Sequence, residues 1–227
     1  MTEPSRRSGG PTPQAGPGLP GRIRRERLAP ATDGLRAVQQ AVLWSFAATG
    51  RPPQPAELAE AALSQLHAGD FLRLDSAGRI QAAYPFSATP TGHRVQITGG
   101  PAVYAMCAID ALGIAPMLGA AVVIRSADPL TGAPITVNVP AEEAAAWDPV
   151  TTVVFDGHVA RAAQGPAADV ACSTINFFTD QATAASWAAS RPDITGTILR
   201  PDEAQQIAAQ IFGPLLDGDL PGPPSEG

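Results

Sequence analysis

The chain has no lysine, few charged residues and only two cysteines. Charged residues make up 16% of its 227 residues, against roughly 25% in a typical globular protein. All fifteen basic residues are arginine, and Gly (22), Pro (24) and Ala are abundant, which is typical of a GC-rich genome. Six of the arginines lie in residues 1–30, so the rest of the chain is acidic. An acidic body does not favour binding to nucleic-acid phosphates.

The chain also lacks a run of eighteen apolar residues, so we expect no membrane-spanning segment. Its N-terminus is polar and rich in Pro and Gly, without the apolar stretch of a secretory signal peptide. We therefore expect a cytoplasmic protein. In that compartment, two cysteines are expected to be free thiols rather than a structural disulfide.

We predict an α+β fold in which an N-terminal winged-helix-like helical module precedes a second domain with a mixed or antiparallel sheet and flanking helices. The predicted ranges are 32–98 for the module and 99–217 for the second domain. Residues 1–31 have no apolar periodicity and are predicted to form a disordered basic tail. Residues 218–227 are predicted to form a second disordered tail.

The winged-helix outline rests on two predicted helices and a hairpin. The first helix runs from Asp33, a candidate N-cap, to about Gly50, and the second covers Ala56–Ala68. The hairpin spans Phe71 to Phe86, and His93–Ile97 adds a short strand. A DNA-binding protein is the less favoured interpretation, because the exposed positions of the second helix are acidic or neutral.

The second half alternates predicted helices and strands rich in Val, Ile and Thr. Predicted strands cover 121–126, 134–139, 151–155, 170–178 and 196–199. Predicted helices cover Pro101–Leu118, with a break or bend at Gly113 and Pro116, a stretch capped by Thr179 and ending at Ser190, and a last helix that opens at Pro201.

The candidate site consists of Cys107, Asp110 and Cys172. Cys107 and Asp110 are spaced i, i+3 at the start of a predicted helix, hence on one face, and the helix dipole is expected to lower the pKa of the Cys107 thiol. Two thiolates select soft metals. Thr174 and Asn176 would share the face of Cys172 on a strand. The alternative is that both cysteines are buried as small apolar residues without a chemical role.

The other candidate functional residues are less suited to catalysis or metal binding. His67, His93 and His158 are scattered on a helix end and two predicted loops, without ligand spacing, and are expected at the surface. Glu142 and Glu143 are expected to form a solvated helix start. The three tryptophans are expected to pack in the core or at its rim (Trp44, Trp147 and Trp187).

Four segments carry a resemblance to a known family: Tyr104–Gly113, Leu130–Pro140, Cys172–Phe178 and Ala185–Ala188. In this order they resemble the organomercurial (alkylmercury) lyases, and the similarity extends from about Leu35 to Leu216. The resemblance implies that Cys107 and Cys172 are the two catalytic cysteines and that Asp110 is the catalytic acid. It also implies protonolysis of R–Hg⁺ to R–H and Hg²⁺.

The same resemblance implies that no cofactor is needed and that Cys107, Cys172 and Asp110 hold mercury as substrate and product. Low-molecular-weight thiols, or hand-off to a mercuric reductase, would then remove Hg²⁺. Neither nucleic acid nor membrane is an expected partner.

Three positions depart from the family pattern. Met106 stands where a Trp is frequent, Asp128 where another Cys is common, and Ser173 where a Cys or other polar residue often follows the second cysteine. Met106 would alter the shape of the pocket for the organic group. The cysteine that Asp128 replaces is expected to have a structural rather than a catalytic role. Two alternatives stay open: a thiol-based protein that binds or senses soft metals without turnover, and a paralogue acting on another substrate.

Overall fold

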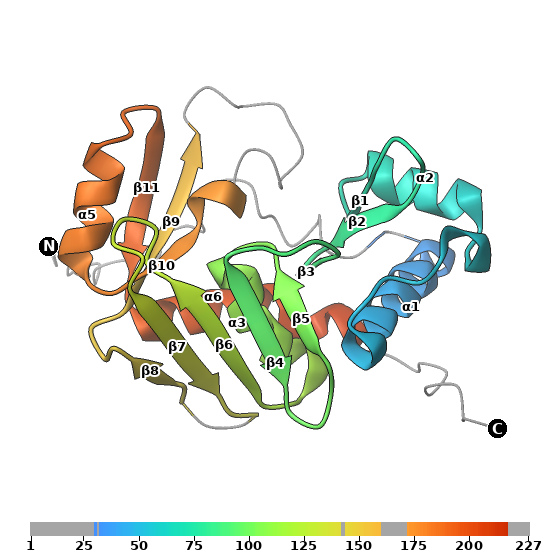
Figure 1. Cartoon of the computed structure of the whole chain (residues 1–227). Helices are drawn as coiled ribbons and strands as arrows, with labels where there is room; N and C mark the ends of the chain where they lie inside the picture. Colours follow the sequence, from blue (N-terminus) through green and yellow to red (C-terminus); the bar gives the residue numbers. More distant parts are fainter. Residues whose placement is uncertain (1–29, 31, 142–143, 160–171, 218–227) are drawn as a thin grey trace, which may run out of the picture.

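The computed structural model describes residues 30, 32–141, 144–159 and 172–217 (Figure 1). The helices, with η for a 3-10 helix, are α1 (Asp33–Thr49), η2 (Pro55–Glu57), α2 (Glu60–Ala68), α3 (Ala108–Leu118), η3 (Cys172–Thr174), α5 (Gln181–Ala189), α6 (Pro201–Phe212) and η4 (Gly213–Leu216). The strands are β1 (Leu72–Leu74), β2 (Ile80–Ala83), β3 (Phe86–Ser87), β4 (His93–Ile97), β5 (Ala102–Ala105), β6 (Val122–Ala127), β7 (Pro134–Val139), β8 (Ala146–Asp148), β9 (Val153–Val159), β10 (Asn176–Phe178) and β11 (Ile194–Leu199). The predicted α+β class is confirmed.

An antiparallel sheet of eight strands forms the body of the molecule, in the order β1-β2-β3-β5-β4-β6-β7-β8. Its strands are rich in β-branched residues that alternate between a buried and a more exposed face. In β4, for example, His93, Val95 and Ile97 are buried, whereas Arg94 is exposed. The buried face is the one on which the helices pack.

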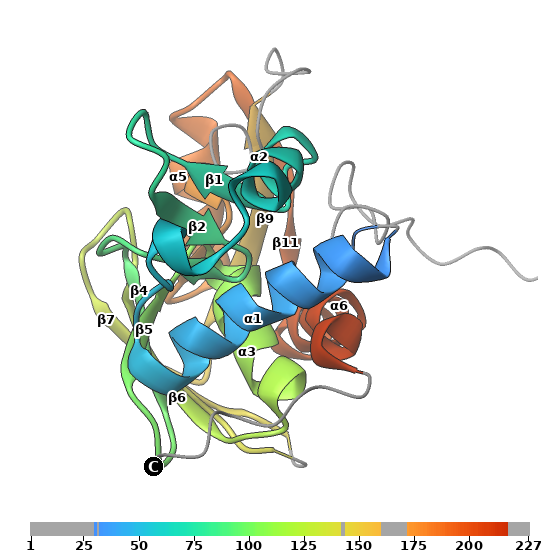
Figure 2. The same cartoon turned by 90° about the vertical axis from the view of Figure 1, so that its right-hand side faces the viewer.

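Helix α3 packs on the buried face of this sheet, and α6 packs against α3 (Figure 2). Gly113 lets the two helices approach closely, because a Cβ there would lie 2.1 Å from Cδ2 of Phe212 on α6. Helix α3 continues without a break through Gly113 and Pro116 to Leu118. A break at these positions is therefore wrong, whereas a bend stays a prediction, and Gly113 serves helix packing.

A second antiparallel sheet has the order β10-β9-β11 and packs with α5 around its own apolar cluster. This cluster contains Phe155, Phe178, Ala184 and Trp187. Strand β10 is also tied to the main core, since the backbone N–H of Ala108 donates to the carbonyl of Ile175 at 3.1 Å. The small sheet thereby brings the segment after Cys172 to the start of α3.

In the N-terminal part, the first predicted helix and the hairpin of β1 and β2 are confirmed. Helix α1 packs on β3 through stacked rings of Phe46 and Phe86, with centroids 5.2 Å apart. Its N-cap is Thr32 rather than Asp33. The second predicted helix is wrong in its first turn, because η2 occupies residues 55–57 and α2 begins only at Glu60. The winged-helix description of this module stays a prediction.

Three predicted boundaries in the second half are also wrong. Residues 102–105 form β5 rather than the start of a helix, because their alternating burial suits pairing with β3 and β4. Residues Cys172–Thr174 form η3, and the predicted strand is limited to Asn176–Phe178. Helix α5 is capped by Asp180, which accepts from the N–H of Thr183, and not by Thr179.

Apart from Pro30, the predicted tails 1–31 and 218–227 lie outside the described residues, as do Glu142 and Glu143. The boundary between 98 and 99 stays a prediction, although strands from both sides join one sheet. Over the ranges that the structure describes, none of the helices has the length and apolar character required to cross a bilayer.

Candidate active site

Cys107 is the N-cap residue of α3 and is separated from the end of β5 by Met106 alone. Its backbone is extended, at φ −151° and ψ −179°, and its Sγ accepts a hydrogen bond from the N–H of Asp110 at 3.4 Å. A thiol thus replaces the Ser, Thr or Asp that usually caps a helix. The cap fixes Cys107 and Asp110 on the same end of α3, as the i, i+3 spacing predicted.

Asp110 lies in the first turn of α3 and is only 3% exposed. Negative charge is favoured at a helix N-terminus. The carboxyl group nevertheless faces thiols rather than a cation, because the hydrogen-bonding groups near it are Cys107 and Cys172. Among the residues that the structure describes, Asp110 therefore has no basic partner in this site.

Cys172 begins η3, which follows the segment outside the described residues and precedes β10. The turn is held by Thr174, whose hydroxyl donates to the carbonyl of Gly157 on β9 at 2.6 Å. The Ala108–Ile175 backbone bond holds the next residue against α3. Cys172 and Thr174 are both buried, but they lie on a helical turn and not on one face of a strand.

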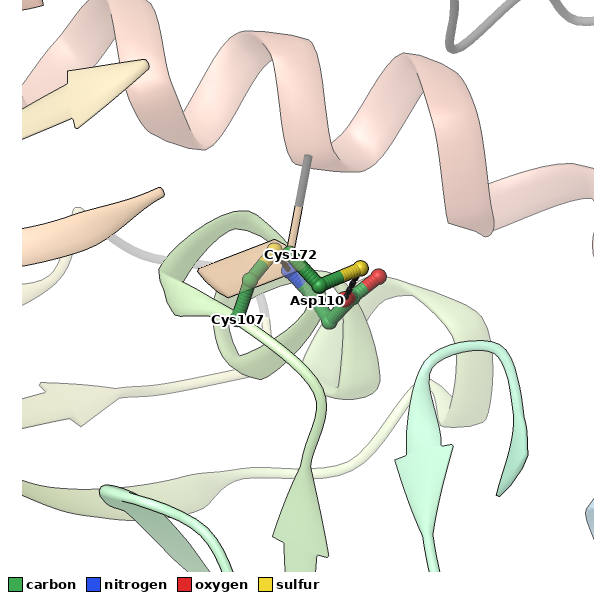
Figure 3. A group of neighbouring side chains, drawn as sticks. All are labelled: Cys107, Asp110 and Cys172. Carbon is green, nitrogen blue, oxygen red and sulfur yellow. Dashed lines mark hydrogen bonds between the residues drawn. The ribbon is translucent and has the colours of Figure 1, made fainter. Parts of the chain in front are cut away.

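The structure brings Cys107, Asp110 and Cys172 together across 65 residues of chain (Figure 3). Both sulfurs and a carboxylate oxygen all lie within 4.8 Å of one another, and Sγ of Cys172 lies 3.9 Å from Oδ2 of Asp110. Both cysteines are free thiols. No other group of three His, Cys, Asp or Glu side chains in the described ranges has metal-site geometry.

Burial raises the pKa of Asp110 to about 7, against the opposing effect of hydrogen bonds from Cys107 and Cys172. A carboxyl group with this pKa takes up and gives off a proton near neutral pH. That property suits a general acid or a proton relay.

Burial also raises the pKa of the Cys107 thiol well above its usual value, and the neighbouring Cys172 and Asp110 add to this effect. The expectation that the helix N-terminus lowers this pKa is wrong, because desolvation of the thiolate outweighs the helix dipole. For Cys172, the hydrogen bond from Cys107 favours the thiolate, but burial and the charges of Asp110 and Asp70 raise the pKa overall. Both shifts favour the protonated thiols near neutral pH.

Asp70 contributes to the raised pKa of Cys172, and the sequence does not predict this role. It lies in the turn between α2 and β1 with φ +61°, an uncommon conformation for a residue with a side chain, and it accepts from the hydroxyl of Tyr84 at 3.4 Å. In the sequence it follows Gly69 like an ordinary turn residue. No local pattern shows that its charge acts on Cys172.

In the part of the chain that the structure describes, the three histidines do not come together as a metal site. His67 and His158 are exposed, whereas His93 is buried on β4 with 4% exposure. The expectation of a surface loop is therefore wrong for His93, and also for the location of His158, which lies on β9. Trp187 is buried in the core of the small sheet, and Trp44 is 39% exposed.

Comparison with known proteins agrees with this geometry. The alkylmercury lyase (MerB) family model matches residues 86–213, a range that includes all three site residues. The chain belongs to the alkylmercury lyase family. An alkylmercury lyase of Streptomyces lividans is 26% identical over 186 residues, covering 79% of this chain and 84% of that protein. One of Staphylococcus epidermidis is 26% identical over 140 residues, or 62% of each chain.

The fold is also similar to a solved structure of this family. The crystal structure of the mercury-bound form of MerB2 superposes with a TM-score of 0.66 at 22% identity, over 84% of this chain and 95% of that one. At this identity the similarity supports the fold.

Asp128, at the position where the resemblance led us to expect a cysteine, has a structural role. Asp128 is 1% exposed and accepts from the N–H groups of Leu130, Thr131 and Thr179 and from the Thr179 hydroxyl. These bonds close the β6–β7 turn and fasten it to the end of β10. Met106 is half-buried beside Cys107, and Ser173 is exposed.

Proposed function

We propose that this protein is an organomercurial lyase that cleaves R–Hg⁺ by protonolysis at Cys107, Asp110 and Cys172. The observation that carries the proposal is the convergence of two free thiols and a buried carboxyl group within 4.8 Å, in a chain of the alkylmercury lyase family. Thiols are the ligands that mercury, a soft metal, prefers. The carboxyl group distinguishes a site for proton transfer from one for metal capture alone.

The proposed reaction balances without any additional reagent. Two thiols and R–Hg⁺ yield R–H, mercury bound by two thiolates, and one released proton. Each sulfur forms a bond to mercury as it loses its proton, and the carbon–mercury bond breaks as carbon receives a proton. Electron donation from sulfur builds negative charge on the departing carbon, which makes that carbon easier to protonate.

In this scheme Asp110 takes a thiol proton and delivers it to carbon. The carboxyl oxygen 3.9 Å from Sγ of Cys172 and the pKa of about 7 support this role. The raised pKa values of the thiols mean that they deprotonate only as mercury binds, when the metal stabilises the thiolate. Proton release and mercury capture are then coupled at one place.

Several further properties belong to the same proposal. Mercury enters as substrate and leaves as product, so no cofactor takes part, and low-molecular-weight thiols or a mercuric reductase remove Hg²⁺. The protein acts in the cytoplasm and binds neither nucleic acid nor membrane. Residues 32–98 form a winged-helix-like module, and residues 99–217 form the catalytic domain.

The decisive test is release of hydrocarbon. Purified protein incubated with a phenylmercuric salt and excess thiol should release benzene, measured by gas chromatography. Cys107→Ser and Cys172→Ser should each nearly abolish release, because a hydroxyl is a poor ligand for mercury. Ser173→Ala, next to Cys172 but exposed, serves as the matched control and should retain activity.

The result also separates the alternatives. Stoichiometric binding of Hg²⁺ without any hydrocarbon would overturn the lyase and favour a protein that binds or senses soft metals. Failure to bind Hg²⁺ would overturn both functions and favour a paralogue with another substrate.

A further inference from the structure

His93 is a buried histidine that the proposed mechanism does not use. Its ring packs edge-on against Phe177 of β10, with 5.6 Å between centroids and 71° between planes. Burial lowers its pKa to about 4 despite the opposing hydrogen bond with Asn176, so the ring is neutral near pH 7. A neutral imidazole has one donor and one acceptor nitrogen, and both need partners when buried.

The polar partners of this ring lead towards Cys172. Nδ1 of His93 lies 3.0 Å from the hydroxyl of Ser126 on β6. The ring packs against Phe177, and the side chain of the preceding residue, Asn176, is the other polar group that acts on it. Nδ2 of Asn176 in turn donates to the carbonyl of Ser173 at 3.2 Å. Ser173 directly follows Cys172. These contacts therefore run from the large sheet to the turn that carries the second sulfur.

This connection complements the other contacts of the segment. The hydroxyl of Thr174 donates a hydrogen bond to the carbonyl of Gly157, and the N–H of Ala108 donates one to the carbonyl of Ile175. These bonds tie η3 to β9 and to α3. The Asn176 amide adds a connection to the large sheet. It contacts the carbonyl of Ser173, the residue after Cys172, and it interacts with His93 on β4.

We infer that His93 is a positioning residue: through Asn176 it holds the turn of Cys172 so that the second sulfur faces Cys107. The inference rests on the proposed function, since a mercury ion bound by two thiolates needs both sulfurs in place at once. Without the ring nitrogens, the Asn176 amide can turn away from the Ser173 carbonyl. A displacement of about 1 Å at a reacting group can reduce a rate by roughly 100-fold.

The test uses His93→Phe, which keeps an aromatic ring against Phe177 but removes both nitrogens. The kcat for benzene release should fall by about 10- to 100-fold with little change in KM. Bound Hg²⁺ should also pass faster to a competing thiol, with weaker mercury–thiolate absorption in the ultraviolet. His158→Phe is the matched control, because His158 also bonds a hydroxyl at 3.0 Å, that of Thr195, and is exposed.

Two additional variants separate positioning from a general loss of stability. His93→Gln retains a donor and an acceptor and should recover much of the lost kcat. Asn176→Leu should resemble His93→Phe, and the double variant should be little worse than either, because both substitutions interrupt the same series of contacts. Thermal unfolding of each variant reports the folded fraction.

A folded His93→Phe variant with wild-type kcat and wild-type retention of Hg²⁺ would overturn the inference. So would equal losses in His158→Phe, or losses that add in the double variant. If His93→Phe does not fold, the kcat and the retention of Hg²⁺ are measured for Asn176→Leu and Ser126→Ala instead, and wild-type values in both variants would overturn the inference. If the unsubstituted protein releases no hydrocarbon, the lyase proposal fails, and the retention of Hg²⁺ still decides the role of His93.

Discussion

Two buried aspartates in different regions of the molecule have opposite pKa shifts. Asp110, in the first turn of α3, is 3% exposed, and Asp128, in the β6–β7 turn, is 1% exposed. The pKa of Asp110 is raised by burial to about 7. Burial also acts to raise the pKa of Asp128, but hydrogen bonds, chiefly from Thr179 and Leu130, outweigh it, and the pKa lies below its usual value.

The difference reflects both depth and donors: Asp110 lies deep in the core at the start of α3, whereas Asp128 lies in a turn nearer the surface and accepts several hydrogen bonds. Asp128 accepts bonds from three backbone N–H groups and a hydroxyl, at 2.8 to 3.1 Å, which replace its water shell. Asp110 faces two thiols, which are weak donors, and one backbone N–H group, that of Cys107. The first arrangement fixes an anion and fastens a turn, whereas the second leaves a proton that can move. The same residue type thus serves structure in one region and chemistry in the other.

Replacing each aspartate by asparagine tests this contrast, and the largest expected difference between the two variants is in the rate of benzene release. Asp110→Asn should slow benzene release by about 10²- to 10⁴-fold, the usual contribution of a general acid, because an amide cannot relay the proton. Binding of Hg²⁺ should remain measurable, since both sulfurs stay. Asp128→Asn, assayed per folded molecule, should release benzene at a rate close to that of the wild type. Equal rates for Asp110→Asn and the wild type would remove the carboxyl group from the mechanism.

Stability should respond to pH in opposite directions at the two sites. For Asp110, the folded pKa of about 7 lies above the unfolded value of 3.8, so its proton stabilises the fold at low pH. This stabilisation is lost as pH rises from about 4 to about 7, and it amounts to at most about 4 kcal/mol. Asp110→Asn should remove this pH dependence and be more stable than the wild type at pH 8, measured by urea unfolding. A wild type whose unfolding free energy has the same pH profile as the variant would contradict the raised pKa.

Much of the fold follows from local pattern. Helices α1 and α6 and strand β7 were predictable, because their apolar residues recur with the period of a helix or a strand. Strand β5 was not. Its residues open an uninterrupted apolar run into α3, and only pairing with β3 and β4 makes them a strand. Pairing with other strands is not visible in the local periodicity of the sequence.

The candidate site was predictable in its residues but not in its electrostatics. The types and spacing of Cys107 and Asp110, together with the resemblance around Cys172, identify the cluster that the structure brings together. The direction of the Cys107 pKa was not predictable, because it depends on complete burial under several elements. His93 was assigned to the surface for a similar reason: its partners come from β6 and β10, far from it in sequence.

The smallest effect concerns the stability of the Asp128 turn. Asp128→Asn places an amide NH₂ against donors, so we expect the unfolding free energy at pH 7 to fall by about 1 to 3 kcal/mol. In the wild type, the lowered pKa of Asp128 stabilises the fold above the unfolded value of 3.8 and ceases to do so as pH falls through the folded pKa. The deficit of Asp128→Asn relative to the wild type should therefore shrink in acid, whereas Asp110→Asn loses its advantage there. If urea unfolding gave both variants the same dependence on pH, hydrogen-bond donors would not be what separates these two carboxyl groups.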